Sequence, residues 1–259
     1  MGWKGSLLGG GIYLAMLGYW CCAVLARTRR ERWSRWAWMA TGAIALGVVV
    51  LRSFETRHWP MQNLFEFFLC LGTVLPWVSL GTQSRLKVDT RLADALMGLI
   101  LLFPAGFVFD DGVKPLPPAL RSPLFMPHVG AYVLGYVLLF RGAVMALPWF
   151  RAASVEKVRD RAVAATVLSG YLLISFGMVL GAIWGKLAWG HYWQWDPKEC
   201  WSLATWLVFT GWLHFRLRFG LTRPRLSAGI LWLGVVGIVL TLTWVNLSRL
   251  FPGLHNYAQ

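Results

Sequence analysis

The sequence predicts an all-α polytopic membrane protein with about eight transmembrane helices and with both termini on the external side. Three observations indicate this fold class. Hydrophobic residues make up 57% of the 259-residue chain and the mean hydropathy is +0.55, whereas apolar usage in soluble domains is roughly 45–50%. The apolar residues form runs close to the roughly 20 residues that a helix needs to cross a bilayer. Basic residues are concentrated in alternate connections between these runs.

Eight apolar runs are expected to span the membrane. They are Leu7–Ala26, Trp36–Leu51, Leu64–Gly81, Leu92–Phe109, His128–Phe150, Val163–Gly185, Glu199–Leu217 and Leu226–Leu247. The first run lacks a cleavable-signal pattern and a basic loop follows it, so it is interpreted as a retained helix. The second run is short, so its helix is expected to extend into the flanking connections. Because little sequence lies outside the runs, residues 1–259 are expected to form a single integral membrane domain.

The distribution of charge predicts the orientation. The connections after the first, third, fifth and seventh runs carry sixteen Lys and Arg residues, whereas those on the alternate side carry eight. The positive-inside tendency therefore places the first set in the cytoplasm and both termini outside. The net charge of +14 belongs to these short connections and not to one basic face. The partner that it favours is the lipid bilayer, and no nucleic-acid partner is expected.

The four cysteines exclude two kinds of site. Cys21, Cys22, Cys70 and Cys200 form no C-x-x-C pattern. A thioredoxin-type redox pair and a covalent c-type haem attachment site both need that pattern. The three cysteines within apolar runs are expected to act as small buried hydrophobes.

A polar, aromatic segment at about residues 187–201 separates the sixth and seventh runs and is expected to be external. It contains Trp189, Trp193 and Trp195, and such a density of flat rings beside a histidine favours a flat, apolar, metal-centred ligand such as haem. The alternative is that these rings only anchor the chain at the membrane interface. Asp196 and Glu199 flank Pro197 as an N-cap and third-position acidic residue, so they are expected to start the seventh helix.

Two further histidines are expected on the same external side as this segment. His128 opens the fifth run, and His255 lies in the tail after the eighth. Neutral imidazoles on opposite faces of a haem would be the two axial ligands of its iron. The alternative interpretation makes His128 an interfacial residue and His255 a residue of an unbound tail. His58 and His191 are also external and receive no role.

Two polar residues are expected deep inside spans, where such side chains are costly. His214 lies about fifteen residues into the seventh run, roughly 22 Å along a helix, and Arg141 lies at a comparable depth in the fifth. His214 is a candidate ligand of a second haem iron, with snorkelling toward the cytoplasmic end as the alternative. Arg141 is a candidate partner for a haem propionate.

The segment from Trp189 resembles the tryptophan-rich WWD signature of haem-handling proteins, W-G-x-x-W-x-W-D. The continuation Pro197-Lys198-Glu199-x-Trp201 is similar to the CcsA (ResC) branch of system II cytochrome c biogenesis. The stretch Arg57–Glu66 and the stretch from Leu120 to His128 resemble that family too. Together these segments extend over most of the chain, from Arg57 to Trp201.

The resemblance implies a membrane haem-binding subunit of a cytochrome c synthetase, part of a haem lyase complex. It implies that haem b is presented at the external WWD segment between His128 and His255, with His214 at a transmembrane haem site. The implied partners are a CcsB/ResB-like membrane protein, an apocytochrome c bearing C-x-x-C-H and, as an option, a thiol-reducing protein. The implied location is a bacterial inner or plasma membrane, or a thylakoid-type membrane, with the haem site facing the periplasm or exterior.

Two alternatives stay open. One is a haem transporter or chaperone that loads another protein without forming thioether bonds. The other is a b-haem electron-transfer anchor of a quinone-linked enzyme. Anchors of that kind normally bury their ligand histidines within spans, whereas this sequence places two candidates at the outer edge.

Overall fold

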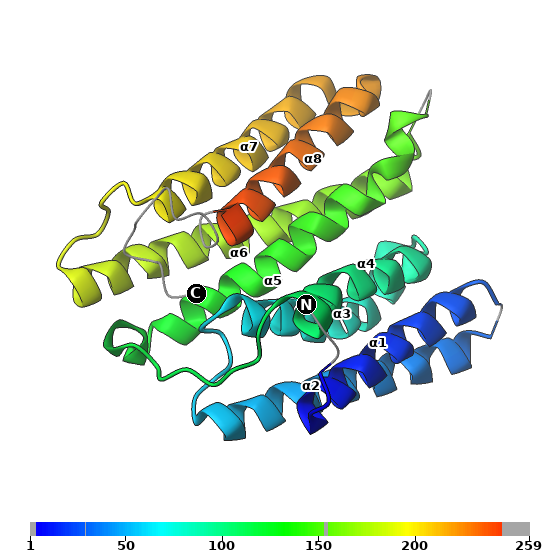
Figure 1. Cartoon of the computed structure of the whole chain (residues 1–259). Helices are drawn as coiled ribbons and strands as arrows, with labels where there is room; N and C mark the ends of the chain where they lie inside the picture. The colour runs from blue at the N-terminus through cyan, green and yellow to red at the C-terminus, as the bar shows by residue number, and fades with distance from the viewer. Residues whose placement is uncertain (1–3, 29, 153–154, 245–259) are drawn as a thin grey trace. The chain divides into compact units, whose positions relative to one another are not determined.

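The computed structural model describes residues 4–28, 30–152 and 155–244, and every regular element in these ranges is helical (Figure 1). Eight α-helices of the described part are joined by short 3₁₀- and π-helical turns. The chain forms two compact units, Met1–Leu116 and Pro117–Gln259. The single integral membrane domain expected from the sequence stays a prediction.

The first unit contains four long helices. They are α1 (Leu7–Ala26), α2 (Glu31–Thr56), α3 (Leu64–Leu86) and α4 (Arg91–Phe103), which continues as the π-helix η1 (Pro104–Val108). Helix α1 packs against α2 and α4, and α3 packs against α2 and α4. Side-chain caps define two of the starts: the Ser6 hydroxyl accepts a hydrogen bond from the Gly9 amide, and the Asn63 side chain accepts one from Glu66.

A buried polar network ties together one end of the first unit. Arg52 of α2 donates to the Glu66 carboxylate of α3 from Nε at 3.1 Å, and both side chains are only 1% exposed. Arg52 also donates to the backbone carbonyls of Asp111 and Gly112, and Lys4 pairs with Asp111 at 3.0 Å. The N-terminal segment, the α2–α3 connection and the segment after η1 therefore lie at the same end of this unit, as the alternation of spans requires.

The second unit contains the other four long helices. They are α5 (Phe125–Met145), α6 (Lys157–Trp189), α7 (Pro197–Phe219) and α8 (Pro224–Val239), with the 3₁₀-helix η2 (Pro118–Arg121) before α5 and the π-helix η5 (Leu240–Trp244) after α8. Helix α5 packs along α6 and α8, and α7 packs on α8. Glycines let α5 and α6 approach closely, since a Cβ at Gly170 would lie 2.9 Å from the Gly135 carbonyl oxygen.

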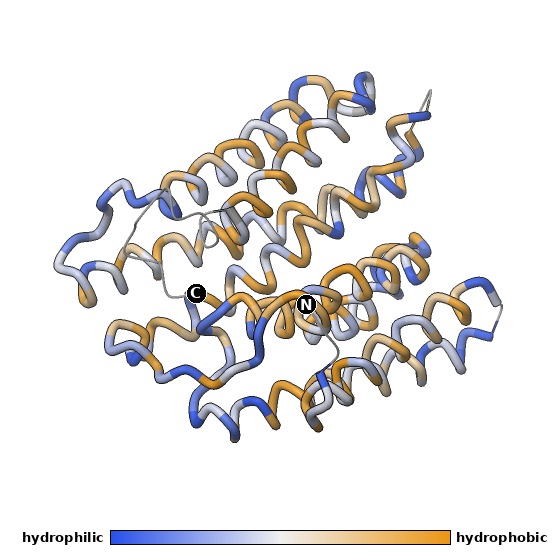
Figure 2. The backbone as a smooth tube through the Cα atoms, in the orientation of Figure 1, coloured by the Kyte–Doolittle hydropathy of each residue, from blue (hydrophilic) through white to orange (hydrophobic). Residues whose placement is uncertain are grey.

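Seven helical segments of the described residues are long and apolar enough to cross a membrane, which makes the chain an integral membrane protein. Figure 2 shows the apolar stretches along the helices and the hydrophilic residues toward their ends. Helix α2 extends beyond the short second run at both ends, as expected. Helix α7 is present but is not among the seven, because its ends carry polar residues: Lys198, Glu199, His214, Arg216 and Arg218.

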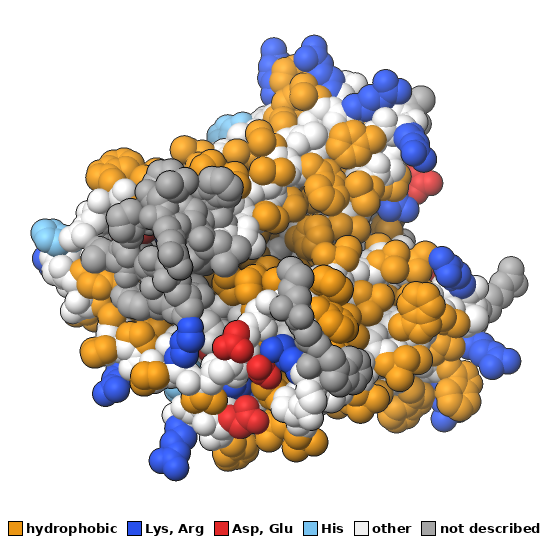
Figure 3. All heavy atoms as spheres, in the orientation of Figure 1, with side chains coloured by type: hydrophobic (Ala, Val, Ile, Leu, Met, Phe, Trp, Pro, Cys, Tyr) orange, Lys and Arg blue, Asp and Glu red, His pale blue; other side chains and the backbone are white. Residues whose placement is uncertain are grey.

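The outer surfaces of the helices are apolar. Large hydrophobic side chains such as Phe54, Leu172 and Leu207 are more than half exposed, and Figure 3 shows hydrophobic side chains over much of the visible surface, with Lys and Arg gathered mainly at helix ends. A soluble protein rarely exposes so much contiguous apolar surface. Contact with lipid hydrocarbon is the environment that fits these side chains.

Candidate functional site

His128 lies in the first turn of α5 and its side chain meets α6. Its Nδ1 lies 2.7 Å from the backbone carbonyl oxygen of Gly177. A carbonyl oxygen only accepts hydrogen bonds, so Nδ1 carries a proton, and in the neutral ring Nε2 then carries the lone pair. The imidazole is therefore in the tautomer that ligates a metal through Nε2.

Trp184 of α6 joins His128 to the aromatic segment. Its ring stacks on the His128 ring at 5.7 Å and 29°, and it meets the Trp189 ring edge-on at 4.7 Å. Its side chain is 2% exposed, and its indole N–H donates to the Ala119 carbonyl of η2 at 3.0 Å. Three segments, η2, the start of α5 and the end of α6, thus meet at one indole.

Trp184 is not predicted as a site residue from the sequence, because an indole in an apolar run ordinarily packs or anchors. The spacing of residues in the sixth run nevertheless indicates a contact face there. Gly177, Gly181 and Trp184 are spaced by four and then three residues, so they share one face of α6. Small residues at such spacing are typical of close helix contacts in membranes.

The aromatic segment begins later than expected from the sequence. Trp189 is the last residue of α6, which ends because Gly190 adopts a left-handed conformation with φ of 84°. The Gly190 amide donates to the Lys186 carbonyl, and the Lys186 ammonium donates back to the Gly190 carbonyl at 2.8 Å. Of the segment predicted at about residues 187–201, only residues 190–196 lie outside helices, because α7 begins at Pro197.

Asp196 and Glu199 cap α7, as the sequence predicts. The Asp196 carboxylate accepts a hydrogen bond from the Lys198 amide at 2.8 Å, and the Glu199 carboxylate accepts from the Asp196 amide at 3.1 Å and from the Gln194 amide at 2.8 Å. Asp196 is 6% exposed. Both carboxylates are thus occupied in holding the segment against the start of α7.

The two remaining tryptophans form a pair of their own. Trp193 and Trp195 meet edge-on at 5.8 Å and 86°. Trp195 is 70% exposed and has a φ of 59°, which is uncommon for a residue other than glycine. Backbone strain is commonly retained at functional sites. The exposed indole is an apolar surface available to a planar ligand.

A pocket of about 500 Å³ lies beside Trp189. Its lining comes from η2 and from the last turn of α6, and it includes Arg121, Ser122 and Trp189. The pocket thus combines one guanidinium and one hydroxyl with an aromatic wall. Such a lining suits a ligand that has both an apolar and an anionic part.

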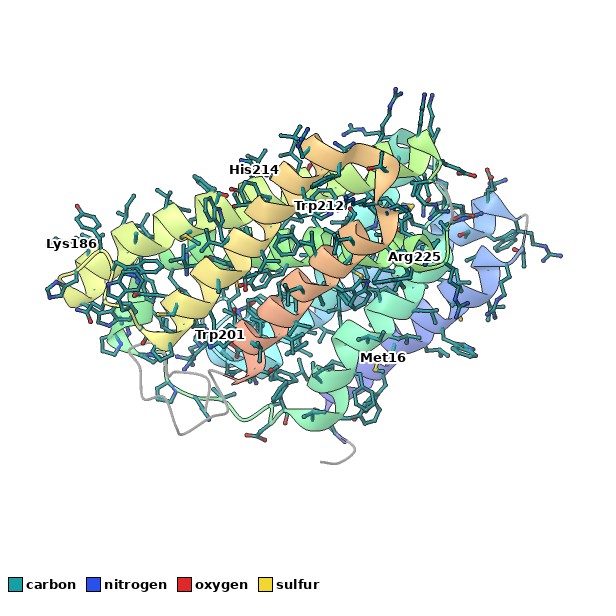
Figure 4. All side chains as sticks on the ribbon, turned by 90° about the horizontal axis from the view of Figure 1, so that it is seen from above. Met16, Lys186, Trp201, Trp212, His214 and Arg225 are labelled. Carbon is teal, nitrogen blue, oxygen red and sulfur yellow. The ribbon has the colours of Figure 1, made fainter. Side chains whose placement is uncertain are left out.

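His214 lies on the exposed side of α7, far along that helix from the aromatic segment (Figure 4). Its Nδ1 donates to the Thr210 carbonyl at 2.9 Å, so this nitrogen carries a proton. The Thr210 hydroxyl is 3.0 Å from the Tyr171 hydroxyl of α6. Two residues beyond His214, Arg216 pairs with Asp160 at the opposite end of α6 from His128.

Arg141 is completely buried in α5. Its neighbour Gly142 packs on Val167 of α6. One turn further along α6, the Tyr171 hydroxyl contacts the Thr210 hydroxyl of α7. Arg141 and His214 therefore lie at similar levels of the second unit, as the sequence predicts. Thirteen helical residues, about 20 Å, separate Arg141 from His128.

The structure thus brings His128 and Trp189 together around Trp184, pairs Trp193 with Trp195, and uses Asp196 as a cap. His255 lies outside the described residues, so its pairing with His128 stays a prediction. His191 is exposed in the aromatic segment, and His58 donates from Nδ1 to the Trp59 carbonyl.

Comparison with solved structures places the helices in a known class of membrane fold. A chain described as cytochrome c haem lyase CcmF superposes with a TM-score of 0.62 at 20% identity, over 95% of this chain and 51% of that chain. The two proteins therefore share an all-helical membrane fold.

Sequence comparison then defines the family. A family model described as "Cytochrome C assembly protein" matches residues 59–255. The cytochrome c biogenesis protein CcsA of Parasynechococcus marenigrum (strain WH8102) is 31% identical over 256 residues, covering 81% of each chain. CcsA of Guillardia theta is 26% identical and covers 95% of this chain and 92% of its own. The chain belongs to the CcsA family of cytochrome c assembly proteins, and its role lies in cytochrome c maturation.

Proposed function

We propose that this chain is the membrane haem-binding subunit of a cytochrome c synthetase, which presents haem b at its external face to apocytochrome c. The observation that carries this proposal is the setting of His128. Its Nδ1–H is held by the Gly177 carbonyl and its ring lies on Trp184 beside Trp189. Metal-ligating histidines almost always donate their second ring N–H to such an acceptor.

The donor set fits haem. His128 and His255 are the proposed axial ligands, and Trp189, Trp193 and Trp195 supply flat apolar rings that pack on a porphyrin. Asp196 orients the segment that carries them by capping α7. Haem b is the substrate here, and it brings the iron that the imidazoles ligate and the two vinyl groups that receive the cysteine thiols.

Catalysis by this chain is chiefly positioning. The histidine of the C-x-x-C-H segment replaces one of the chain's ligands, which brings the two neighbouring thiols to the edge of the ring. Each thiol adds across one vinyl group. The S–H bond and the C=C π bond break, one C–S and one C–H bond form, and no oxidant or reductant is consumed. Fixing ring and thiols in one orientation makes a bimolecular addition effectively unimolecular. Two imidazole ligands also help to keep the iron reduced.

His214 and Arg141 are proposed to serve a second haem deeper in the membrane. Their similar level along α6 supports this assignment. His214 would supply an iron ligand and Arg141 would pair with a propionate. A CcsB/ResB-like partner is proposed to complete the synthetase and to supply the missing ligand of that site.

The test is the absorption spectrum of the purified protein and of the variants His128→Ala, His255→Ala and His214→Ala. We expect a reduced b-type spectrum that is lost or altered in both external variants, with a separate loss in His214→Ala. His191→Ala is the matched control, because His191 is exposed in the same segment without a proposed role. If His128→Ala and His255→Ala both keep the wild-type haem spectrum, the proposed external haem site is wrong. That result would favour an electron-transfer anchor with quinone activity.

Covalent attachment separates the synthetase from a haem chaperone. The chain is co-expressed with its CcsB-like partner and with an apocytochrome c that bears C-x-x-C-H. Haem that stays on the cytochrome after denaturation is the expected result. Haem transfer that is lost on denaturation would assign the chaperone function instead.

A further inference from the structure

We infer that one face of α6, formed by Gly177, Gly181 and Trp184, positions the His128 imidazole and fixes its tautomer. This inference rests on the proposed function, because it assigns the residues that hold a proposed haem ligand. None of the three touches the haem iron in this scheme. They act through His128 and are therefore positioning residues.

Gly181 leaves the space that the imidazole occupies. A Cβ at this position would lie 2.5 Å from Cε1 of His128 and 2.8 Å from its Nδ1, which is closer than carbon and nitrogen atoms pack. The colliding atoms belong to a rigid ring that is already hydrogen-bonded, so they have little freedom to move aside. Any residue larger than glycine at position 181 must displace the ring.

Gly177 supplies the hydrogen-bond acceptor. Its carbonyl oxygen accepts the Nδ1–H at 2.7 Å, and a Cβ at Gly177 would lie 2.9 Å from the Tyr132 ring of α5. Close approach of the two helices at this glycine thus brings the carbonyl within reach of His128. A ligand held by such a bond is more basic and better oriented.

Trp184 limits rotation of the imidazole on its other side. Its ring stacks on His128, and its indole N–H is fixed by the Ala119 carbonyl. The same indole contacts Trp189. The orientation of His128 is therefore coupled to the aromatic segment through one buried side chain.

The first test is Gly181→Ala, with Gly130→Ala as the matched control. Gly130 lies two residues after His128, and a Cβ there would meet nothing within 4 Å. Alanine is the better helix former at both positions, so lost helix propensity cannot explain a defect. We expect Gly181→Ala to retain haem about 10- to 100-fold more weakly, as when outer-shell partners of a ligand are removed, and Gly130→Ala to match the wild type.

The second test is Trp184→Phe, which keeps an aromatic ring beside His128 but removes the hydrogen bond to Ala119. We expect haem to remain bound with an altered low-spin spectrum and a shifted reduction potential. The melting temperature of each variant, measured without haem, reports separately on folding. An unchanged spectrum and potential in both Trp184→Phe and Gly181→Ala would overturn the inference.

A third measurement needs no bound haem. The wild-type chain contains five histidines, so ring-¹⁵N-histidine labelling gives a small set of NMR signals, and His128→Gln identifies the one of interest. We expect His128 in the haem-free protein to have a protonated Nδ1 and an unprotonated Nε2 at neutral pH. The opposite tautomer, or a mixture of the two, would overturn the inference.

These outcomes distinguish the inference from the proposed function. If His128→Ala leaves the haem spectrum unchanged, then the proposed ligand is wrong whatever Gly181→Ala does. If His128→Ala removes the signal while Gly181→Ala and Trp184→Phe retain it unaltered, then only the positioning role of α6 is wrong.

Discussion

Asp196 in the aromatic segment is both a negatively charged residue and the N-cap of α7. Its carboxylate accepts the Lys198 amide hydrogen bond, and it lies between the exposed Trp195 and the start of α7. An N-cap needs a side-chain acceptor and not a negative charge. Asparagine and alanine therefore separate the two properties at this position.

Asp196→Ala should lower stability by about 0.5–2 kcal/mol and weaken haem retention, because the segment loses its attachment to α7. Asp196→Asn should stay close to the wild type, since its side-chain oxygen still accepts. Thermal unfolding and the haem spectrum of the two variants check this expectation. If Asp196→Asn behaves like Asp196→Ala, the negative charge is needed for more than capping.

The Arg52–Glu66 pair gives a second prediction for single residues. Both side chains are 1% exposed and directly bonded, so Arg52→Ala leaves a buried carboxylate without its main partner. A loss of roughly 3–5 kcal/mol is expected, measured by detergent or thermal denaturation. Arg32→Ala, at an exposed position, is the control. The double variant Arg52→Met with Glu66→Met should recover much of the loss. Failure to recover would show that the other hydrogen bonds dominate, from Arg52 to the Asp111 and Gly112 carbonyls and from the Gln62 amide to Glu66.

At the scale of elements, α6 is the helix that connects the two proposed haem levels. Its C-terminal half holds His128, and its N-terminal end pairs Asp160 with Arg216 of α7 through two contacts of 2.6 and 3.3 Å. Helix α7 buries few residues, namely Thr205, Phe209 and Trp212. Helix α7 also contacts α6 through two further hydrogen bonds, from the Trp206 indole to Ser175 and between the Thr210 and Tyr171 hydroxyls.

Asp160→Ala should loosen this end of α7 and alter the haem signal assigned to His214, while the signal assigned to His128 remains. The pair is partly exposed, so the loss in stability should be at most about 1 kcal/mol. The measurement is the reduction potential of each of the two haem signals, the one assigned to His214 and the one assigned to His128. Exchanging the charges, Asp160→Arg with Arg216→Asp, should restore the wild-type values, and Arg218→Ala is the control. A change confined to the haem signal assigned to His128 would contradict the assignment of the second signal to His214.

At the scale of the whole molecule, the charge pattern predicts which helix ends are external. His191 and Arg218 are both exposed; His191 lies in the connection before α7, and Arg218 lies in the last turn of that helix. In a background with the native cysteines replaced, His191→Cys should react with a membrane-impermeant maleimide in intact cells. Arg218→Cys should react only after lysis. The reverse pattern would invert the orientation, and labelling of both in intact cells would mean that α7 does not cross the membrane.

The pattern of apolar runs and capping residues is sufficient to predict the positions of the helices and the start of α7. Apolar runs such as Leu7–Ala26 coincide with observed helices because span length and hydrophobicity are local properties. The Asp196–Glu199 cap is equally local, since its hydrogen bonds join residues a few positions apart. The family resemblance rests on the same continuous segments, so it depends on the sequence and not on how the helices pack.

The way in which His128 is held depends on contacts between helices that are distant in the sequence. Gly177, Gly181 and Trp184 lie about fifty residues from His128 in the chain, and their importance appears only when α5 and α6 pack. The pairing of Arg52 with Glu66 and with the Asp111 carbonyl is of the same kind. Periodicity tells which residues share a face of one helix, but the contacts between two helices depend on their register and separation. These are set by packing over the whole interface.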